Sequence, residues 1–322
     1  MQKACKEGRK DLFDLMILNK DIYYNQGLVG ACEGGNDAVI KMMLYLGAND
    51  YNHGLYCSCE GGHLEIINMM LELGVDDYNL GLRGACQGGH LNIVKLMLSL
   101  GATDYNAGLW GACQGGHLEI VKMMLSLGTY NYNYGFYSAC IGGHLEIVKI
   151  MLSIGTLSYN YGLYYACIGG HLEIVKIMLS IGTLSYNYGL YYACIGGHDA
   201  VVNMMLSLGA NEYNWGLKGA CLRGHLNIVK MMIELGANDY NQGLKSACRG
   251  CYVEIVKMML KLGADKIDYI QNGNLEYDIL YSRLTRKVID LPIKKQHPEY
   301  HLLKFYNKHV PDIDRLINKY LF

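Results

Sequence analysis

Cysteine and histidine side chains recur four residues apart along most of this chain, a spacing at which both groups can bind zinc. Cys86 and His90 form one such pair, and the same pair returns in six further places. Structural zinc needs about four ligands at ~2.0–2.3 Å, whereas each place offers two and packed helices stand ~10 Å apart. One copy also has Asn36 instead of the histidine. We therefore expect no metal site, with the cysteine buried as a small apolar residue and the histidine in a turn or cap.

Other reactive groups are also spaced for packing rather than for catalysis. Ten of the twelve cysteines recur at equal intervals from Cys5 to Cys248, and we expect them to lie beyond the ~7 Å that a disulfide can bridge. Such a pattern fits a reducing compartment. The chain has no phosphate-binding loop, dinucleotide fingerprint, nucleophile elbow or metalloprotease motif. We therefore expect no enzymatic activity and no cofactor.

Charge and hydropathy argue against nucleic-acid and membrane binding. The formal net charge is -1, from 28 Lys+Arg and 29 Asp+Glu, so a general electrostatic attraction to nucleic acid or anionic lipid is missing. No apolar run approaches the ~18 residues that span a bilayer. Residues 1–15 are charged where a signal peptide is apolar. We expect a cytoplasmic protein, with the nucleus as an open alternative.

The elements that carry these residues follow a period of 27 residues. About ten units account for residues 1–266, the first of them truncated. Residues 140–171 and 167–198 are identical at all 32 positions, which indicates a recent internal duplication. A unique catalytic constellation does not fit units that are copied whole. The dipeptide Tyr-Asn marks the period, starting at positions 24, 51, 78, 105, 132, 159, 186, 213 and 240.

Each unit is expected to form a pair of helices, and the unit at 105–131 illustrates the pattern. Leu118–Leu125 has helix formers and apolar residues on more than one face, which is typical of a helix packed between neighbours. A shorter helix is expected from about Ala107 to Gln114, with Asn106 as its N-cap. Gly128 ends the longer helix, where a left-handed backbone favours glycine. The same role is predicted for Gly47, Gly74, Gly101, Gly155, Gly182, Gly209, Gly236 and Gly263.

The string Gly-Gly-His-Leu-Glu-Ile-Val-Lys-x-Met-Leu-x-Leu-Gly-Ala-x-Asp resembles the second helix and following turn of the ankyrin repeat. Ala85 and Cys86 stand where ankyrin repeats have two small residues. Ankyrin repeats usually have about 33 residues and begin Thr-Pro-Leu-His, whereas residues 107–110 here read Ala-Gly-Leu-Trp and the β-hairpin region is shortened. The resemblance therefore implies an all-α, ankyrin-like solenoid with shortened or absent β-hairpins. Short units rich in Tyr and Asn are similar to ankyrin-like proteins of giant DNA viruses of amoebae.

Residues 267–322 break the period and contain all three prolines of the chain. Residues 275–288 and 313–322 have helical patterns separated by these prolines. We expect a helical C-terminal cap that shields the last repeat. A docking segment is the alternative, because Leu291-Pro292-Ile293 resembles the F-box-like ends of some viral ankyrin proteins, which recruit a ubiquitin ligase; the chain would then be a substrate adaptor.

Residues that differ between units are the candidate partner-binding residues, because packing accounts for the rest. Three such positions per unit lie on one face of the first helix, and in ankyrin-like solenoids these helices line the concave surface. Tyr and Trp are typical interface anchors. We therefore expect a non-enzymatic scaffold for protein–protein interaction that binds a protein partner, a host protein if the chain is viral. The expected partner-binding residues are Trp110, Tyr134, Tyr137, Tyr161, Tyr164, Tyr188, Tyr191 and Trp215.

Two alternatives stand beside this interpretation. The aromatic side chains could pack on one another and fill the space left by the missing hairpin. They could also stack on single-stranded nucleic acid, although Lys218, Lys245 and Arg249 supply basic charge only at one end of the row. The repeated tyrosines, from Tyr24 to Tyr240, are expected to stack along the turn edge beside a ladder of asparagine hydrogen bonds.

Overall fold

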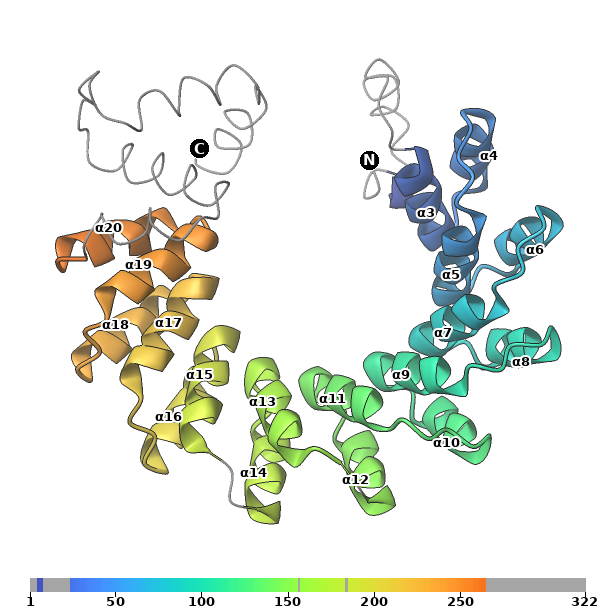
Figure 1. Cartoon of the computed structure of the whole chain (residues 1–322). Coiled ribbons are helices and arrows are strands. Elements are labelled where there is room, and N and C mark those ends of the chain that lie inside the picture. The colour runs from blue at the N-terminus through green and yellow to red at the C-terminus, as the bar shows by residue number, and fades with distance from the viewer. Residues whose placement is uncertain (1–4, 8–23, 156, 183–184, 265–322) are drawn as a thin grey trace, which may run out of the picture. The chain divides into compact units, whose positions relative to one another are not determined.

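The computed structural model describes residues 5–7, 24–155, 157–182 and 185–264. Within these residues the chain forms nine pairs of helices and no β-strand, which confirms the predicted all-α class (Figure 1). The expected C-terminal cap and the alternative docking segment at 267–322 lie outside the described residues. None of the described helices has the length and apolar character needed to cross a bilayer.

The first helix of each pair has 10 or 11 residues and the second has 9 or 10. The prediction that the first helix is the shorter of the two is therefore wrong. The reason is that the first helix begins at or next to the repeated tyrosine, earlier than predicted. The first helices are α3 (Tyr24–Gly34), α5 (Tyr51–Gly61), α7 (Tyr78–Gly88), α9 (Tyr105–Gly115), α11 (Asn133–Gly142), α13 (Tyr159–Gly169), α15 (Tyr186–Gly196), α17 (Tyr213–Arg223) and α19 (Tyr240–Arg249). The second helices are α4 (Asp37–Tyr45), α6 (Leu64–Glu72), α8 (Leu91–Ser99), α10 (Leu118–Ser126), α12 (Leu145–Ile154), α14 (Leu172–Ile181), α16 (Asp199–Ser207), α18 (Leu226–Glu234) and α20 (Val253–Lys261).

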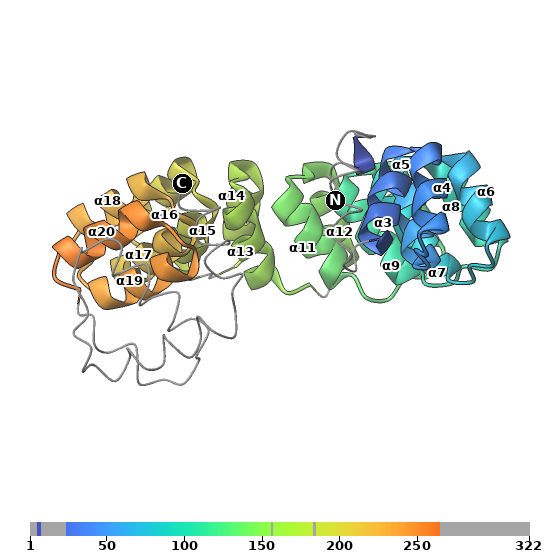
Figure 2. The ribbon, with the colours of Figure 1, turned by 90° about the horizontal axis from the view of Figure 1, so that it is seen from above.

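The helix pairs belong to two compact units. Unit 1 contains the residues up to Ala166 together with Glu173–Ile181, and unit 2 contains Cys167–Leu172 and the residues from Gly182 onwards. In unit 1, α3, α5, α7, α9 and α11 lie along the inner side of a curved stack and the second helices lie along its outer side (Figure 1). In unit 2, α15 packs on α17, and α17 packs on α19. Figure 2 shows these helices from above.

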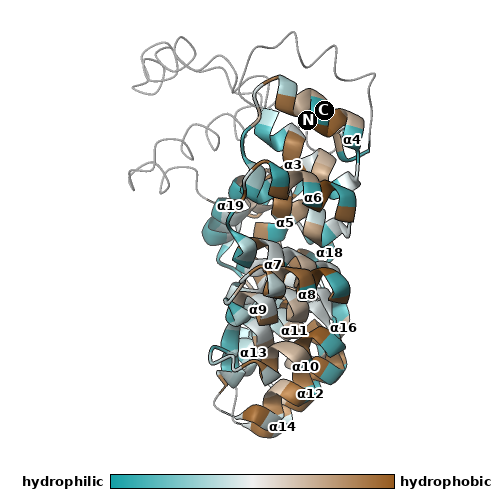
Figure 3. Cartoon of the chain, turned by 90° about the vertical axis from the view of Figure 1, so that its right-hand side faces the viewer, coloured by the Kyte–Doolittle hydropathy of each residue, from teal (hydrophilic) through white to brown (hydrophobic). Residues whose placement is uncertain are grey.

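The core is repeated once per helix pair. Ile120, Val121 and Met124 of α10 are buried, as are the residues at the same positions of the other second helices whose burial is described. Complete burial of such a side chain contributes roughly 1.5–3 kcal/mol. A Cβ atom on Gly108 of α9 would lie 2.7 Å from Met124 Sδ, so glycine allows the two helices to approach. Much of α10, α12 and α14 is brown in Figure 3, the colour of hydrophobic residues, which agrees with the prediction that more than one face of these helices is apolar.

Four of the first helices are capped by an aspartate rather than by asparagine. Asn106 was predicted to cap α9, but that prediction is wrong, because Asp104 is the N-cap and its Oδ1 accepts a hydrogen bond from Ala107 N at 3.0 Å. A carboxylate at this position suits the partial positive charge of a helix N-terminus. Helices α5, α7 and α19 begin in the same way, at Asp50, Asp77 and Asp239.

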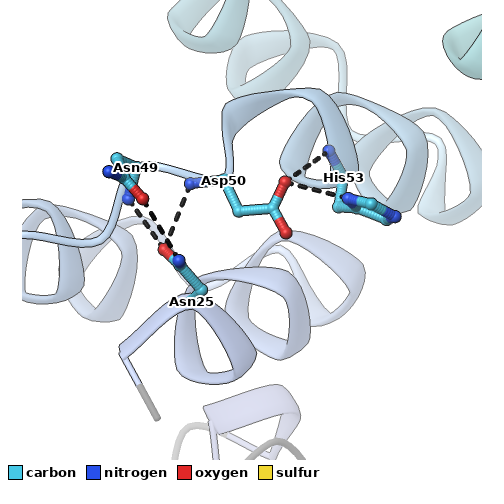
Figure 4. A network of polar contacts seen from close by, with 4 residues as sticks. All are labelled: Asn25, Asn49, Asp50 and His53. Atoms are coloured by element: carbon cyan, nitrogen blue, oxygen red, sulfur yellow. Dashed lines mark hydrogen bonds and ion pairs between the residues drawn. The ribbon is translucent and has the colours of Figure 1, made fainter. Parts of the chain in front are cut away.

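The asparagine of the Tyr-Asn dipeptide joins six of the repeats to the next, whereas Asn52 Oδ1 is buried and has no hydrogen-bond partner within the described residues. In Figure 4, Asn25 Oδ1 accepts hydrogen bonds from the backbone N–H groups of Asn49 at 2.7 Å and Asp50 at 3.1 Å. Asn25 Nδ2 in turn donates to Asn49 Oδ1 at 3.2 Å. The predicted asparagine ladder is therefore confirmed, and its members tie the turns to the helices before them. Equivalent bonds are made by Asn79, Asn106, Asn133, Asn187 and Asn214.

Glycine follows the second helix as predicted, with one exception. Leu127 is the C-cap of α10, and Gly128 comes next with a φ of 93°, in the left-handed region that favours glycine. Gly182 differs, because its φ of -169° is extended backbone that any residue adopts. The predicted left-handed role is therefore wrong for Gly182 and confirmed for the other eight positions.

Histidine forms a second set of bonds between repeats. His117 is the N-cap residue of α10, but its ring makes no capping bond. Instead His117 Nε2 lies 3.0 Å from Gln87 O, near the end of α7 in the preceding repeat. Because a carbonyl oxygen can only accept, Nε2 carries the proton and donates, which satisfies one of the carbonyls that a helix end leaves free. The same bond is made by His63, His90, His144, His198 and His225.

The cysteines are core residues. All twelve are free thiols, and all except Cys251 are buried. Burial raises the pKa of Cys113 to about 12, and it acts in the same direction on the others. These thiols are therefore protonated at physiological pH and poorly reactive, because the thiolate is the nucleophile.

Replacing His117 with alanine should lower the free energy of unfolding by about 1–2 kcal/mol, because Gln87 O then loses its donor near the end of a helix. Urea denaturation followed by circular dichroism measures this change. His53→Ala is the matched control, since the His53 side chain is exposed and outside the set, and it should change stability by less than ~0.5 kcal/mol. Equal losses in both variants would contradict a role of the histidine bonds in joining repeats.

Thiol labelling should separate Cys251 from the other eleven cysteines. In the native chain at mildly alkaline pH, Cys251 should react with a disulfide reagent at least ~100-fold faster than the rest, because only it is partly accessible. Unfolding in guanidinium should release all twelve thiols. The Cys251→Ser variant should lose the fast phase and nothing else; a fast phase that persists would place accessible thiols elsewhere.

Candidate functional site

The eight predicted partner-binding residues fall into two rows on the first helices. Counted from the repeated tyrosine as the first position, residues at the third position are exposed: Tyr134 at 62%, Tyr161 at 54%, Tyr188 at 43% and Trp215 at 41%. Residues at the sixth position are half-buried against neighbouring helices, and these are Trp110, Tyr137, Tyr164 and Tyr191. The two interpretations of the aromatic residues therefore apply to different rows: the sixth-position row packs between repeats, and the third-position row remains available.

In unit 1 the aromatic residues contact one another across successive first helices. The ring centroids of Trp110 and Tyr134 are 6.3 Å apart, and those of Tyr137 and Tyr161 are 5.6 Å apart. Tyr161 also meets Tyr164 edge to face at 5.9 Å. Such pairs contribute about 0.5–1.5 kcal/mol beyond the area they bury. Each exposed ring thus rests on a half-buried ring that fixes its position.

Tyr165 is an aromatic contact that the sequence analysis missed. Its ring stacks on Tyr137 at 5.3 Å with an interplanar angle of 22°. The same helical position is glycine in other repeats, where a Cβ atom on Gly84 would lie 2.3 Å from Tyr56 O and one on Gly111 2.6 Å from Arg83 O. The signal in the sequence is that Tyr165 stands where other repeats have a glycine, such as Gly84 or Gly111.

Unit 2 holds a smaller aromatic group. Tyr188 and Trp215 have ring centroids 5.2 Å apart, and both are exposed. Tyr191 meets Tyr192 edge to face at 5.1 Å, and burial raises the pKa of the Tyr191 hydroxyl. Tyr191 is therefore mainly a packing residue, like Trp110 and Tyr164 in unit 1.

Arg83 of α7 lies between two aromatic rings of unit 1. Its guanidinium carbon is 3.8 Å from the centroid of the Trp110 ring and 5.7 Å from that of Tyr56. Contacts of this kind are worth roughly 0.5–2 kcal/mol. Trp110 Nε1 also donates a hydrogen bond to Ser138 Oγ at 2.9 Å. The sequence analysis did not include Arg83 among the partner-binding residues. Tyr56 and Trp110 stand one 27-residue period before and after it, but only the structure shows that the guanidinium lies over both rings.

A pocket of about 440 Å³ lies beside Arg83, and we call it the Arg83 pocket. Trp110 and Tyr134 supply its aromatic lining, and Asp77 and Asp104 add two carboxylates. Arg83 Nε is buried, and none of the described residues accepts a hydrogen bond from it. An unpaired buried donor costs about 1–3 kcal/mol, and Arg83 Nε is the one such atom among the residues that line this pocket within the described chain.

A network of polar side chains continues the surface toward α3. Tyr56 Oη donates to Gln87 Oε1 at 2.8 Å, and Gln87 Nε2 donates to Glu60 Oε1 at 2.8 Å. Burial raises the pKa of Tyr56 to about 12. Burial, followed by the charge of Glu33, raises the pKa of Glu60. These side chains hold one another in place and leave the charge of the surface uneven, with carboxylates toward α3.

Two other features were considered in the sequence: stacking of the repeated tyrosines, and metal binding by the cysteine–histidine pairs. The expected stacking of the repeated tyrosines is not observed in the described residues, where ring contacts join the rows on the first helices instead. Within the same residues no group of three or more His, Cys, Asp or Glu side chains is placed to hold a metal ion. The histidine of each pair points back to a carbonyl oxygen, and its cysteine lies in the core.

Comparison with known proteins gives the family of these repeats. Residues 109–184 and 136–214 match the family model described as ankyrin repeats (3 copies). Among solved structures, the chain is similar to the ankyrin repeat domain of human ASB11, with 24% sequence identity and a TM-score of 0.37 over 48% of this chain and 83% of that chain. No significant match was found among curated proteins. The match to the family model falls on helix pairs that recur every 27 residues, and residues 109–214 are ankyrin repeats with shortened units.

Proposed function

We propose that the chain is a non-enzymatic scaffold that binds a partner protein on the face formed by its first helices. Ankyrin repeats are generally protein–protein interaction modules, and their presence in this chain supports the general role. The positions that differ between repeats lie on this face, whereas the repeated positions are occupied by packing and by the histidine and asparagine bonds. The face is therefore free to change its partner without changing the fold.

The observation that carries the proposal is the exposure of Tyr134 and Tyr161 on helices whose other apolar residues are largely buried. Exposed aromatic residues that gather in one place commonly mark interaction sites, and tyrosine and tryptophan dominate the binding energy of many interfaces. Both rings also rest on half-buried rings, so little conformational entropy is left to lose on binding.

Trp110, Tyr164 and Tyr191 are less suitable for testing the proposal than the exposed row. Each is half-buried, and Trp110 also contacts Arg83 and Ser138. Loss of binding after their truncation would therefore be mixed with loss of packing. The exposed tyrosines separate these effects.

The double variant Tyr134→Ala/Tyr161→Ala should bind a partner at least ~10-fold more weakly than the unchanged chain, because it removes two exposed anchors. The partner is first isolated on the immobilised chain and identified, and the affinity of the purified partner is then measured by calorimetry. The free energy of unfolding should fall by about 1.5 kcal/mol or more, because the variant removes three ring contacts worth about 0.5–1.5 kcal/mol each, so the affinity is measured at a temperature where both chains remain folded.

Tyr45→Ala/Leu64→Ala is the matched control. Tyr45 is 90% exposed and Leu64 is 53% exposed, and both belong to second helices. This variant should keep the affinity of the unchanged chain. If the control loses as much affinity as the tyrosine variant, the partner does not bind on the first helices and the proposal is wrong.

A further inference from the structure

The Arg83 pocket contains a guanidinium whose two faces are covered by aromatic rings and whose Nη groups have no hydrogen-bond acceptor within the described residues. The guanidinium lies between the rings of Trp110 and Tyr56, which hold its plane. Within the described residues it makes no hydrogen bond and no ion pair, and its Nε is buried. A planar guanidinium presents its donors in a fork that matches a carboxylate, and such a fork loses little entropy when it binds.

Two further donors face the same pocket. In other repeats, the side-chain nitrogen of the ladder asparagine donates to an asparagine in the following turn, as Asn25 does to Asn49. In the turns that follow Asn79 and Asn106, the position of Asn49 is occupied by Thr103 and Tyr130. The Nδ2 atoms of Asn79 and Asn106 therefore have no acceptor within the described residues. Both asparagines line the pocket. The asparagine ladder therefore has unused donors beside Arg83.

The two carboxylates of the pocket are partly compensated. Asp77 Oδ1 accepts a hydrogen bond from Leu80 N, and Asp104 Oδ1 accepts one from Ala107 N, both at 3.0 Å. Each carboxylate caps a helix, whose N-terminus carries a partial positive charge. Arg83 has no corresponding anion. The pocket carries two carboxylates and one guanidinium, and of these only the guanidinium lacks a hydrogen-bond partner within the described residues.

We infer that the Arg83 pocket binds the side-chain carboxylate of an aspartate or glutamate in an extended segment of a partner protein. This inference rests on the proposed function and names the chemistry of the partner. The carboxylate pairs with the guanidinium fork of Arg83, and backbone carbonyl groups of the same segment accept from Asn79 and Asn106. Asp77 and Asp104 accept from its backbone N–H groups. Tyr134, exposed at the edge of the aromatic lining, packs against the apolar part of the segment.

The test is selection of short displayed peptides on the full-length chain. Selected peptides should carry one acidic residue at a fixed position, and changing it to the neutral amide should lower the affinity at least ~10-fold. Arg83→Met should cause the same loss, and Arg83→Lys should not restore binding, because lysine lacks the planar fork. Lys218→Met, which removes a cation from the sixth position of α17, should leave the affinity unchanged.

Two readouts locate the ligand and check the fold. The chain has two tryptophans, so in the Trp215→Phe background the fluorescence of Trp110 reports on the pocket and should change when an acidic peptide binds. The melting temperature of Arg83→Met should be close to that of the unchanged chain, because removal of an unpaired buried donor offsets the loss of the contacts with the Trp110 and Tyr56 rings. A large fall in melting temperature would assign Arg83 a structural role and overturn the inference.

The remaining outcomes separate this inference from the proposed function. Selection of basic peptides would overturn the inference, because Asp77 and Asp104 would then determine the ligand. A peptide whose affinity falls when its C-terminus is converted to an amide would show binding of a chain terminus instead. Binding that is lost in Tyr134→Ala/Tyr161→Ala but not in Arg83→Met would leave the proposed function standing without this inference. Binding insensitive to all of these variants would overturn both.

Discussion

The contact between successive repeats is the constraint on which the rest of this structure depends. A single helix pair cannot bury its apolar residues alone, so its stability comes from its neighbours. Glycine at positions such as Gly108 allows the helices to approach until Met124 fills the space between them. At one edge the histidine bonds a helix-end carbonyl of the preceding repeat, and at the other the asparagine bonds the following turn. The whole repeated part of the unit is engaged in these contacts.

Because the repeated residues are engaged, recognition is left to the positions that vary. The aromatic residues at these positions divide by depth: Trp110, Tyr137, Tyr164 and Tyr191 are half-buried between repeats, whereas Tyr134, Tyr161, Tyr188 and Trp215 are exposed. Tyr137 supports Tyr161, and Trp110 supports Tyr134. A surface of this kind is rigid before it meets a partner, which lowers the entropic cost of binding. Packing and exposure are thus complementary parts of one surface rather than competing explanations of it.

Small departures from the repeat create the most distinctive chemistry. Thr103 and Tyr130 replace the turn asparagine and leave the amides of Asn79 and Asn106 unused. Arg83 stands in a row that is otherwise mostly aromatic in the middle repeats, and its neighbours cover its faces but not its edges. None of these departures disturbs the helices, because the backbone bonds of the ladder are kept. A repeat protein can therefore acquire a polar pocket through a few substitutions.

The sequence by itself determined the period, the two helices per unit, the glycine turns after the second helix and the absence of strands in the described residues, because each depends on local patterns of residue type. Only the tertiary structure decided that Asp104 rather than Asn106 caps α9 and that His117 donates to Gln87 O instead of capping α10. It also decided which aromatic rings are exposed and that Arg83 lies between two of them. The physical reason is that His117 and Asn106 find their partners in the neighbouring repeat, 30 and 24 residues away in the sequence, so Asn106 bonds the following turn and leaves the cap of α9 to Asp104.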